Sequence, residues 1–117
     1  MAEFILQPTS SFSMNPFLMI SGHIASNKQK EFEQTFSIGF NNLPKTCLKY
    51  TLSEDTNNPG LFHFFSVWKD KNAFLTFKGS HEFQLLNGVF HALGSVDQVI
   101  SGNVFDNDMN HYSIPEF

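Results

Sequence analysis

The sequence predicts a small α+β fold in which helices cover one face of a single antiparallel sheet. Two parts of the chain carry apolar residues at helical spacing, whereas four segments alternate or run apolar in the manner of strands. These elements follow one another as strand, helix, strand, strand, helix pair, strand, which is the β-α-β-β-α-β arrangement. The length of 117 residues fits one domain built around one hydrophobic core.

The N-terminal part of the chain predicts an arm followed by a first strand. Residues 1–16 hold Pro8 and Pro16 among residues that are typical of turns, so we expect an arm rather than part of the core. The segment 17–24, FLMISGHI, is apolar on both faces of an extended chain and predicts the first strand.

The next segment predicts a helix. Ser26 and Gln29 have the spacing of a capping box, in which the serine side chain caps the first turn and the glutamine reaches back to the cap residue. Pro44 closes the segment. Between these limits a single apolar stripe recurs at helical spacing and consists of Phe32, Phe36, Phe40 and Leu43.

A hairpin is predicted after this helix. In residues 46–53 the side chains alternate, which places Cys47 and Tyr50 on opposite faces of a strand. Residues 54–60 form a polar turn, and residues 61–68, LFHFFSVW, predict the most apolar strand of the chain. Two strands joined by a short turn form an antiparallel hairpin.

Two consecutive helices are predicted next. Asp70 is expected to cap a short helix that Gly79 ends, and Ser80 is expected to cap a second helix that Gly94 ends. Short polar side chains at these positions can accept hydrogen bonds from the free N–H groups of a first helical turn.

The last part of the chain completes the element order. Residues 97–105 predict the final strand, and the polar residues 106–117 predict a C-terminal tail. The folded domain is therefore expected to span residues 17–105. Its element order is that of the ferredoxin-like fold, in which the helices leave one face of the sheet uncovered.

The strand 61–68 is apolar on both faces, and this pattern concerns how copies of the chain assemble. Phe62 and Phe64 point to one side, whereas Leu61 and Phe65 point to the other. A strand of this kind needs cover on both faces, and the predicted helices cover only one. The other face would expose a larger apolar patch than monomers usually do. We therefore expect a homodimer in which two sheets pack face to face as a dimeric α+β barrel.

Composition and charge exclude several kinds of partner and site. The net charge is −4 and the seven Lys and Arg residues are scattered singly, so no nucleic-acid partner is expected. No apolar run approaches the ~20 residues of a membrane span. Met1–Leu6 holds Glu3 and no basic residue, unlike a secretory signal, so we expect a cytoplasmic protein. The chain has one cysteine and no phosphate-binding loop, nucleophile elbow or Cys/His array, so no cofactor or metal is expected.

A pattern around the central hairpin and the helices after it resembles a known family. It consists of Tyr50 and Leu52, the turn residues Asn58 and Pro59, Trp68 at the strand end, Ala73 and Phe74 in the next helix, and Ser80 and Phe83 at the start of the helix after that. Together these residues resemble the antibiotic biosynthesis monooxygenase family over roughly residues 17–105.

The resemblance implies a dimeric α+β barrel with a pocket for a flat aromatic substrate between sheet and helices. Members include cofactor-independent oxygenases of polycyclic phenols, quinol monooxygenases and haem-degrading monooxygenases. Phe77 stands where the haem-degrading members place an iron-ligating histidine, another family histidine is displaced to His81, and the first strand lacks their asparagine. The resemblance therefore disfavours haem degradation. It is compatible with metal-free oxygenation, in which the electron-rich carbanion of the phenol substrate reacts directly with oxygen.

Two strand histidines are the candidate catalytic residues. His63 and His23 lie on strands that are neighbours in the ferredoxin-like order, so their imidazoles are expected to lie near each other. Histidine titrates near neutral pH and suits a proton acceptor for a phenol or quinol, with His63 the first candidate and His23 the second. The alternative is that both are structural histidines satisfied by hydrogen bonds or located at a dimer interface.

Aromatic residues are the candidate substrate-binding set. Trp68, at the end of the central strand, either stacks on a planar ligand or contributes buried area to the core. The remaining members of the predicted pocket are Phe64, Phe77, Phe83 and Phe90.

The sequence thus leaves two principal functions open. The first is a cofactor-independent monooxygenase-like protein that acts on a planar aromatic or quinol-type small molecule. The second is a non-catalytic dimeric barrel that binds a hydrophobic ligand or a protein partner, which Phe77 in place of histidine favours. Haem binding through a displaced histidine is a third alternative. An open cavity with a buried histidine would favour the enzyme, whereas an interior filled by phenylalanine rings would favour a structural or interaction role.

Overall fold

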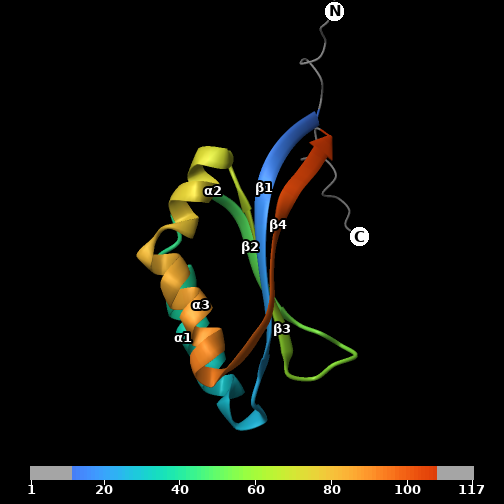
Figure 1. The fold of residues 1–117 in the computed structure, drawn as a ribbon, viewed down its shortest axis with the longest axis vertical. Helices are drawn as coiled ribbons and strands as arrows, with labels where there is room; N and C mark the ends of the chain where they lie inside the picture. The colour runs from blue at the N-terminus through green and yellow to red at the C-terminus, as the bar shows by residue number, and fades with distance from the viewer. Residues whose placement is uncertain (1–11, 108–117) are drawn as a thin grey trace, which may run out of the picture.

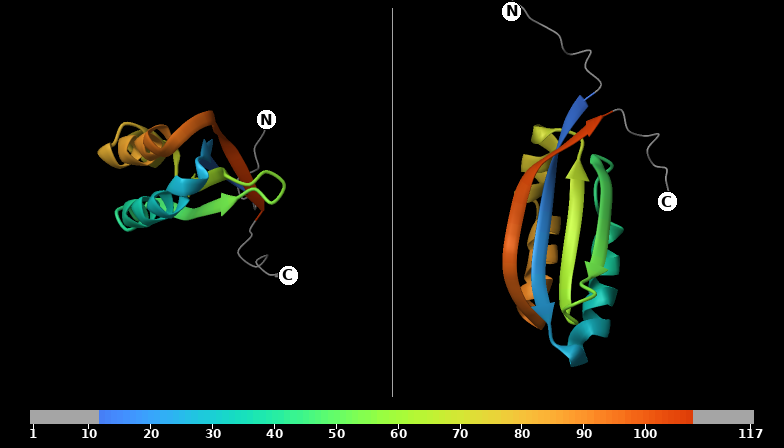
Figure 2. Two further views of the ribbon diagram at one scale, coloured as in Figure 1. Left: turned by 90° about the horizontal axis from the view of Figure 1, so that it is seen from below. Right: turned by 90° about the vertical axis from the view of Figure 1, so that its right-hand side faces the viewer.

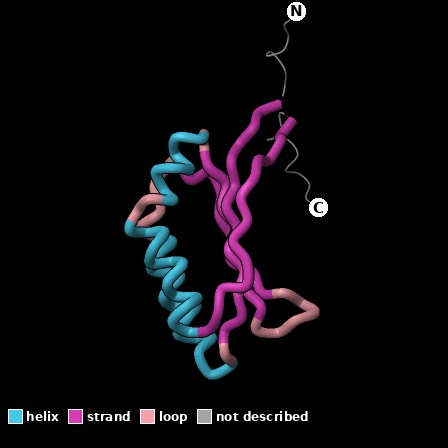
Figure 3. Tube along the Cα trace, in the orientation of Figure 1, coloured by secondary structure: helices cyan, strands magenta, loops and turns pink. Residues whose placement is uncertain are grey.

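The computed structural model of the protein describes residues 12–107, which fold into one sheet and one layer of helices (Figure 1). The tube in Figure 3 shows the helices together on one side of the strands. The elements in chain order are β1 (Phe12–Ile24), the 3-10 turn η2 (Ser26–Lys28), α1 (Gln29–Phe40), β2 (Cys47–Glu54), β3 (Leu61–Trp68), α2 (Lys71–Lys78), α3 (His81–Leu93) and β4 (Gly94–Asn107).

The sheet has the strand order β2-β3-β1-β4, and every pairing in it is antiparallel (Figure 2). Strands β1 and β3 are therefore neighbours, as predicted. Ile20 pairs with Phe64 and Ser21 pairs with His63, which fixes the side chains that share each face. This order and the single helical layer confirm the predicted ferredoxin-like α+β fold.

Strand β1 begins at Phe12, earlier than the predicted start at residue 17. Its first residues pair only with β4, because the pairing with β3 starts at Phe17. Pro16 lies in this region, where the strand has a free edge and a missing N–H can face away from the ladder. The side-chain amide of Asn15 also donates to the carbonyl oxygens of Trp68 and Lys69, at 3.3 and 3.2 Å.

The predicted capping box at the start of the first helix is wrong. Residues 26–28 form a 3-10 turn instead, and the Lys28 N–H donates to the carbonyl oxygen of Ala25 at 2.8 Å. The Ser26 side chain makes no cap, and the Gln29 amide donates to the Ile24 carbonyl at 3.4 Å. The tight turn thus satisfies locally a backbone group that the serine was expected to cap.

The predicted caps of α2 and α3 are confirmed. The Asp70 carboxylate accepts from the Ala73 N–H at 2.8 Å, and the Ser80 hydroxyl accepts from the Phe83 N–H at 3.1 Å. Each side chain satisfies a first-turn donor that the helix itself leaves free. Gly79 follows the last turn of α2, as predicted.

Strand β4 begins at Gly94 directly after α3, before the predicted start at residue 97. Two glycines allow this close junction. A Cβ at Gly94 would lie 1.9 Å from the carbonyl oxygen of His23, and a Cβ at Gly22 would lie 2.1 Å from that of Ser95. The pairing with β1 then shifts its register between Ser21 and Gly22, which forms a β-bulge.

The predicted alternation of β2 fails at its first residue. The register of β2 against β3 shifts between Cys47 and Lys49, so Cys47 lies opposite Trp68. Cys47 therefore packs against the core together with Leu52, on the same side of the sheet as Tyr50. Burial raises the pKa of the Cys47 thiol above its ordinary value. A bulge cannot be recognised from alternation alone, because it adds one residue to the period.

No helix within residues 12–107 is long and apolar enough to cross a membrane. Of the predicted C-terminal tail, residues 108–117 lie outside the described residues.

Candidate functional site

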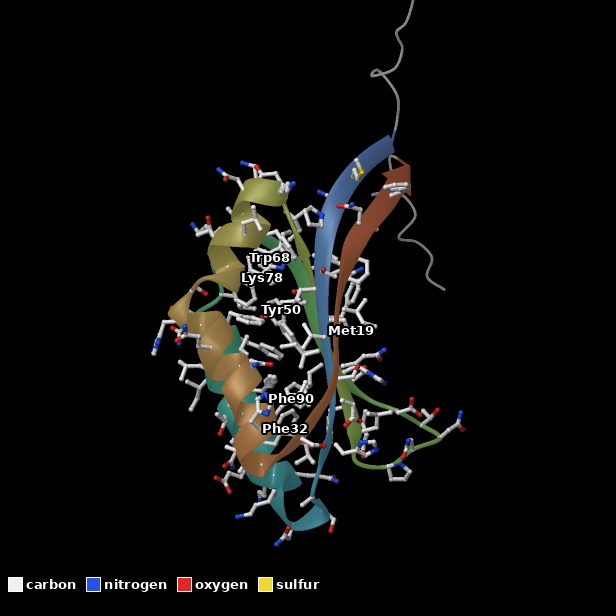
Figure 4. All side chains as sticks on the ribbon, viewed as in Figure 1. Met19, Phe32, Tyr50, Trp68, Lys78 and Phe90 are labelled. Atoms are coloured by element: carbon white, nitrogen blue, oxygen red, sulfur yellow. The ribbon has the colours of Figure 1, made fainter. Side chains whose placement is uncertain are left out.

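The space between the sheet and the helices is filled by aromatic rings. Figure 4 shows Phe32, Tyr50, Trp68 and Phe90 in this layer and Met19 on the other side of the sheet. The ring centroids of neighbouring pairs lie 4.4–5.6 Å apart, the distances of packed aromatic pairs. The members of this aromatic layer are Phe32, Phe36, Phe40, Tyr50, Phe62, Phe64, Trp68, Phe77, Phe83 and Phe90.

Trp68 is fully buried in this layer, and its indole N–H is satisfied inside the protein. The indole donates to the Ser66 hydroxyl at 2.9 Å, and that hydroxyl donates to the Leu18 carbonyl at 3.2 Å. One face of the indole stacks on Phe77 at 4.4 Å. The hydrogen bond and the stacking contact therefore fix the position of the Trp68 side chain in the core.

The structure brings together all of the aromatic residues that the sequence predicted for a pocket. Phe64 and Phe90 are fully buried, Phe77 is 2% exposed, and Phe83 packs edge-on against Phe77 at 5.6 Å. They form a packed wall and not the lining of an open interior cavity.

An open depression lies next to this wall, beside α2 (residues 71–78). It has a volume of about 510 Å³, and Phe77 lines it together with residues from the loop after α1 and from the starts of α2 and α3. Its polar lining includes the side chains of Asn42, Thr46, Asn72, Thr76 and Ser80. Sequence analysis identified Phe77 as a pocket residue but missed these polar neighbours. They come from three separate elements and share no motif.

Charged groups also line this α2 depression. Lys69 and Asp70 lie at the end of β3, and Glu82 lies in the first turn of α3. The Asp70 carboxylate already accepts from the Ala73 N–H. The Glu82 side chain makes no hydrogen bond or ion pair with any of residues 12–107, so its carboxylate is available to a ligand.

The face of the sheet opposite the helices carries a second apolar surface. The rings of Phe17 and Phe65 lie 5.4 Å apart, and Met19 pairs with Phe65 across the strands. All of these side chains are partly exposed. We call this surface the outer stripe, and it consists of Phe17, Met19, Phe65, Val67 and Ile100.

His63 lies on this outer face, and both of its ring nitrogens have partners. Its Nδ1 lies 2.7 Å from the Ser21 hydroxyl, and its Nε2 lies 3.5 Å from an Asp55 carboxylate oxygen. The pKa of Asp55 is lowered, first by the hydrogen bond from the Asn57 N–H and also by the hydrogen bond and charge of His63.

His23 lies on the same face and has a different partner. Its Nδ1 lies 2.6 Å from an Asp97 carboxylate oxygen, and Ser95 donates to the other oxygen of Asp97 at 3.3 Å. Asp97 is the extra residue at the bulge in β4, between the pairs Ser21–Gln98 and Gly22–Val96. The two candidate histidines thus share a face, but that face is opposite the one that holds Trp68 and Phe77.

The part of the chain that the structure describes holds no group of three or more His, Cys, Asp and Glu side chains able to bind a metal ion.

The fold is that of a small α+β protein of the ferredoxin-like class, and comparison with known proteins identifies its family. The profile of the antibiotic biosynthesis monooxygenase family matches residues 18–87, which is more than half of the chain. The chain therefore belongs to this family. No curated protein matches the chain.

Solved structures share the fold at low sequence identity. A conserved protein from Methanosarcina mazei Go1 has 13% identity and a TM-score of 0.65, over 78% of this chain and 91% of that one. A provisionally identified antibiotic biosynthesis monooxygenase from Deinococcus radiodurans has 20% identity and a TM-score of 0.59, over 76% and 89%. A further antibiotic biosynthesis monooxygenase has 20% identity and a TM-score of 0.55, over 77% and 94%. These likenesses show the shared fold. The match of the family profile supports the assignment to the monooxygenase-like class.

Proposed function

We propose that this protein is a cofactor-independent, monooxygenase-like protein that binds a planar aromatic or quinol-type molecule in the α2 depression. The observation that carries the proposal is the depression itself. Its volume of about 510 Å³ lies within the ordinary range of small-molecule sites, roughly 300–1,000 Å³. Phe77, which stacks on Trp68, is the aromatic member of its lining, and the surrounding amides and hydroxyls suit the oxygen atoms of a quinol.

The proton acceptor in this proposal is Glu82. His63 and His23, the expected acceptors, lie on the opposite face of the sheet, and both ring nitrogens of His63 already have partners. Glu82 lines the depression and has no partner among residues 12–107. In this role its carboxylate accepts the phenolic proton while the electron-rich ring reacts with oxygen.

The second candidate is a non-catalytic protein with the same ligand site. The packed aromatic layer favours it, because no histidine side chain of residues 12–107 lies among the buried rings. In this alternative the α2 depression binds an aromatic molecule and releases it unchanged.

Oxygen uptake and binding, measured together on a panel of hydroquinones, separate the two functions. Uptake with product formation supports the oxygenase, whereas saturable binding without uptake supports the non-catalytic protein. Thr76→Trp fills the depression from an exposed position on α2 and should abolish binding. Leu75→Trp is the matched control, because Leu75 is the preceding residue, is 53% exposed and does not line the depression. Equal binding by both variants would overturn the assignment of the site.

We also propose that the outer stripe is covered by a second copy of the chain. Two identical stripes bury each other in an isologous contact, in which the same patch serves both subunits. Phe17 and Phe65 would then lie against their counterparts, giving the face-to-face packing of two sheets that the sequence predicts. The partly exposed side chains of five apolar residues, which the helical layer does not reach, support this arrangement.

A further inference from the structure

The ends of strands β1 and β4 extend past the rest of the sheet as a two-stranded ribbon. Residues 12–16 pair with residues 103–107, whereas the pairing of β1 with β3 starts only at Phe17. Figure 1 shows this ribbon at the same end of the molecule as α2. The Asn15 amide connects the ribbon to the end of β3, where Lys69 lines the α2 depression. The ribbon therefore begins next to that depression.

The ribbon carries an uncovered apolar pair on its helix side. Met14 and Phe105 are direct cross-strand partners, and their exposed fractions are 59% and 67%. Leu18, four residues after Met14 on β1, is buried in the core, and strand residues four apart share a face. The pair therefore faces the side of the sheet on which the helices lie. A second copy on the outer stripe would leave this pair uncovered.

The charges around the α2 depression are also unmatched. Lys69 lines the depression, and Lys71 and Lys78 are the first and last residues of α2. None of these three lysines forms an ion pair within the part of the chain that the structure describes. The carboxylates that line the depression are those of Asp70 and Glu82, which leaves one net positive charge. An occupant with apolar and acidic side chains would suit this end of the molecule.

The segment that follows the ribbon has side chains of both kinds. Residues 106–110, DNDMN, are rich in Asp and Asn, which favour turns. Residues 111–117, HYSIPEF, come next and include the aromatic Tyr112 and Phe117 and the acidic Glu116. This composition fits a segment that reverses direction after the ribbon and returns toward α2.

The length of this segment matches the distance that it has to cover. A turn at residues 108–110 returns the chain along the ribbon and brings Tyr112 to the level of Phe105. The five residues from Tyr112 to Phe117 then span at most about 17–18 Å. That length is enough to pass the base of the ribbon and enter the depression.

We propose that residues 108–117 dock on the helix side of their own chain. Tyr112 covers the Met14–Phe105 pair, and Phe117 enters the α2 depression. Glu116 then lies beside Lys69. The docked segment restricts access of other ligands to the depression. The docking needs no ligand, so its test is separate from that of the proposed monooxygenase-like function.

Disulfide trapping in the full chain tests this contact. Cys47→Ala removes the only thiol, and Thr76→Cys with Pro115→Cys then places one thiol at the depression and one beside Phe117. We expect this pair to crosslink within one chain at least ~10-fold faster than a Leu75→Cys/Pro115→Cys pair, because docking raises the local concentration of the tail thiol at the depression. Leu75 is the matched control, since it precedes Thr76 and is exposed but does not line the depression.

A substitution in the tail tests the anchor itself. Phe117→Ser in the Thr76→Cys/Pro115→Cys chain should slow crosslinking at least ~10-fold, because it removes the apolar surface that docking buries. Asn110→Ser is the control, because it changes the expected turn and neither aromatic residue. If the cysteine variants fold poorly, NMR of the unmodified chain gives the same answer. We then expect nuclear Overhauser effects from the Phe117 ring to the Thr76 methyl group.

Each alternative occupant has its own outcome, and each would overturn the proposal. Equal crosslinking rates at Thr76 and Leu75, or no Overhauser effect in the unmodified chain, would show that the tail does not dock there. A crosslinked product of dimer size on a non-reducing gel would assign the depression to the tail of a second copy. Faster crosslinking of Thr76→Cys to Phe4→Cys than to Pro115→Cys would assign it to the N-terminal arm.

Discussion

Both faces of the sheet are apolar, but they differ in burial within the single chain. On the helix side, Phe64 and Trp68 are fully buried among other rings. On the other side, Phe65 and Val67 of the same strand remain partly exposed. Strand side chains alternate between the two faces. Adjacent residues of β3 therefore lie in a fully buried core on one face and on a partly exposed surface on the other.

This difference separates the candidate functions in space. The helix side holds the aromatic layer and, at its end, the α2 depression with Phe77 and Glu82. The outer face holds the outer stripe and the two histidines paired with Asp55 and Asp97. A histidine on the outer face cannot act on a ligand that lies under the helices, so the two faces need separate tests.

The largest expected effect compares two neighbouring phenylalanines. Phe64→Ala should lower the free energy of unfolding by about 3–5 kcal/mol, because it opens a cavity beside the buried ring of Phe36 and the partly buried ring of Phe40. Phe65→Ala, on the other face, should cost about 1 kcal/mol or less in dilute protein. Urea unfolding measures both values. Equal losses would show that the outer face is as tightly packed as the helix side.

The second prediction concerns glycines at a tight and at an open position. Gly22→Ala should destabilise the protein by about 1–3 kcal/mol, because the new Cβ meets the Ser95 carbonyl oxygen and the Phe90 ring. Gly88→Ala should stabilise it by about 0.5–1 kcal/mol, since a Cβ there meets nothing within 4 Å and alanine favours the helix. Thermal unfolding of both variants measures the two values, and a stabilising Gly22→Ala would contradict the close junction with β4.

The third prediction concerns the buried hydroxyl beneath Trp68. Ser66→Ala removes the acceptor of the indole N–H and leaves that donor unsatisfied in the core. We expect a loss of about 1–3 kcal/mol. Ser53→Ala, on an exposed position of β2, should change stability by less than about 0.5 kcal/mol. If the two serine variants unfold alike, the hydrogen bond contributes no stability.

Most of the fold was predictable from the sequence because its signals are local. Helical spacing in Phe32 and Phe36 and the caps Asp70 and Ser80 each depend on neighbouring residues, and the structure confirms them. The capping box at Ser26 failed because a 3-10 turn competes for the same backbone groups. The bulge in β2 was also missed, which misplaced Cys47.

The candidate site was less predictable because its contacts are distant in sequence. His23 and Asp97 are 74 residues apart and meet only through the pairing of β1 with β4. Asp55 reaches His63 from a loop, and no periodic signal shows in which direction a loop carboxylate points. The α2 depression likewise combines three separate parts of the chain.

The smallest expected effect is a dependence of the protein's stability on pH in the acidic range. The pKa of Asp55 is lower in the folded protein than its ordinary value of 3.8, so the unfolded chain binds its proton more readily. Its contribution to stability is therefore complete above the ordinary value and is lost as the pH falls through the folded value. Asp55→Asn should flatten the fall in stability across this acidic range, which urea unfolding at several pH values measures. An unchanged profile would argue against the carboxylate's hydrogen bonds with Asn57 and His63.

The central claim, that the helices finish one face of the sheet and a second copy finishes the other, is tested most directly by sedimentation equilibrium. The parent chain should be a dimer at micromolar concentration. Phe65→Glu should be a folded monomer, because it places a charge in the outer stripe. Leu85→Glu, on an exposed position of α3, should remain a dimer. A parent chain that is a stable monomer at that concentration, or a Phe65→Glu variant that stays dimeric, would contradict the account.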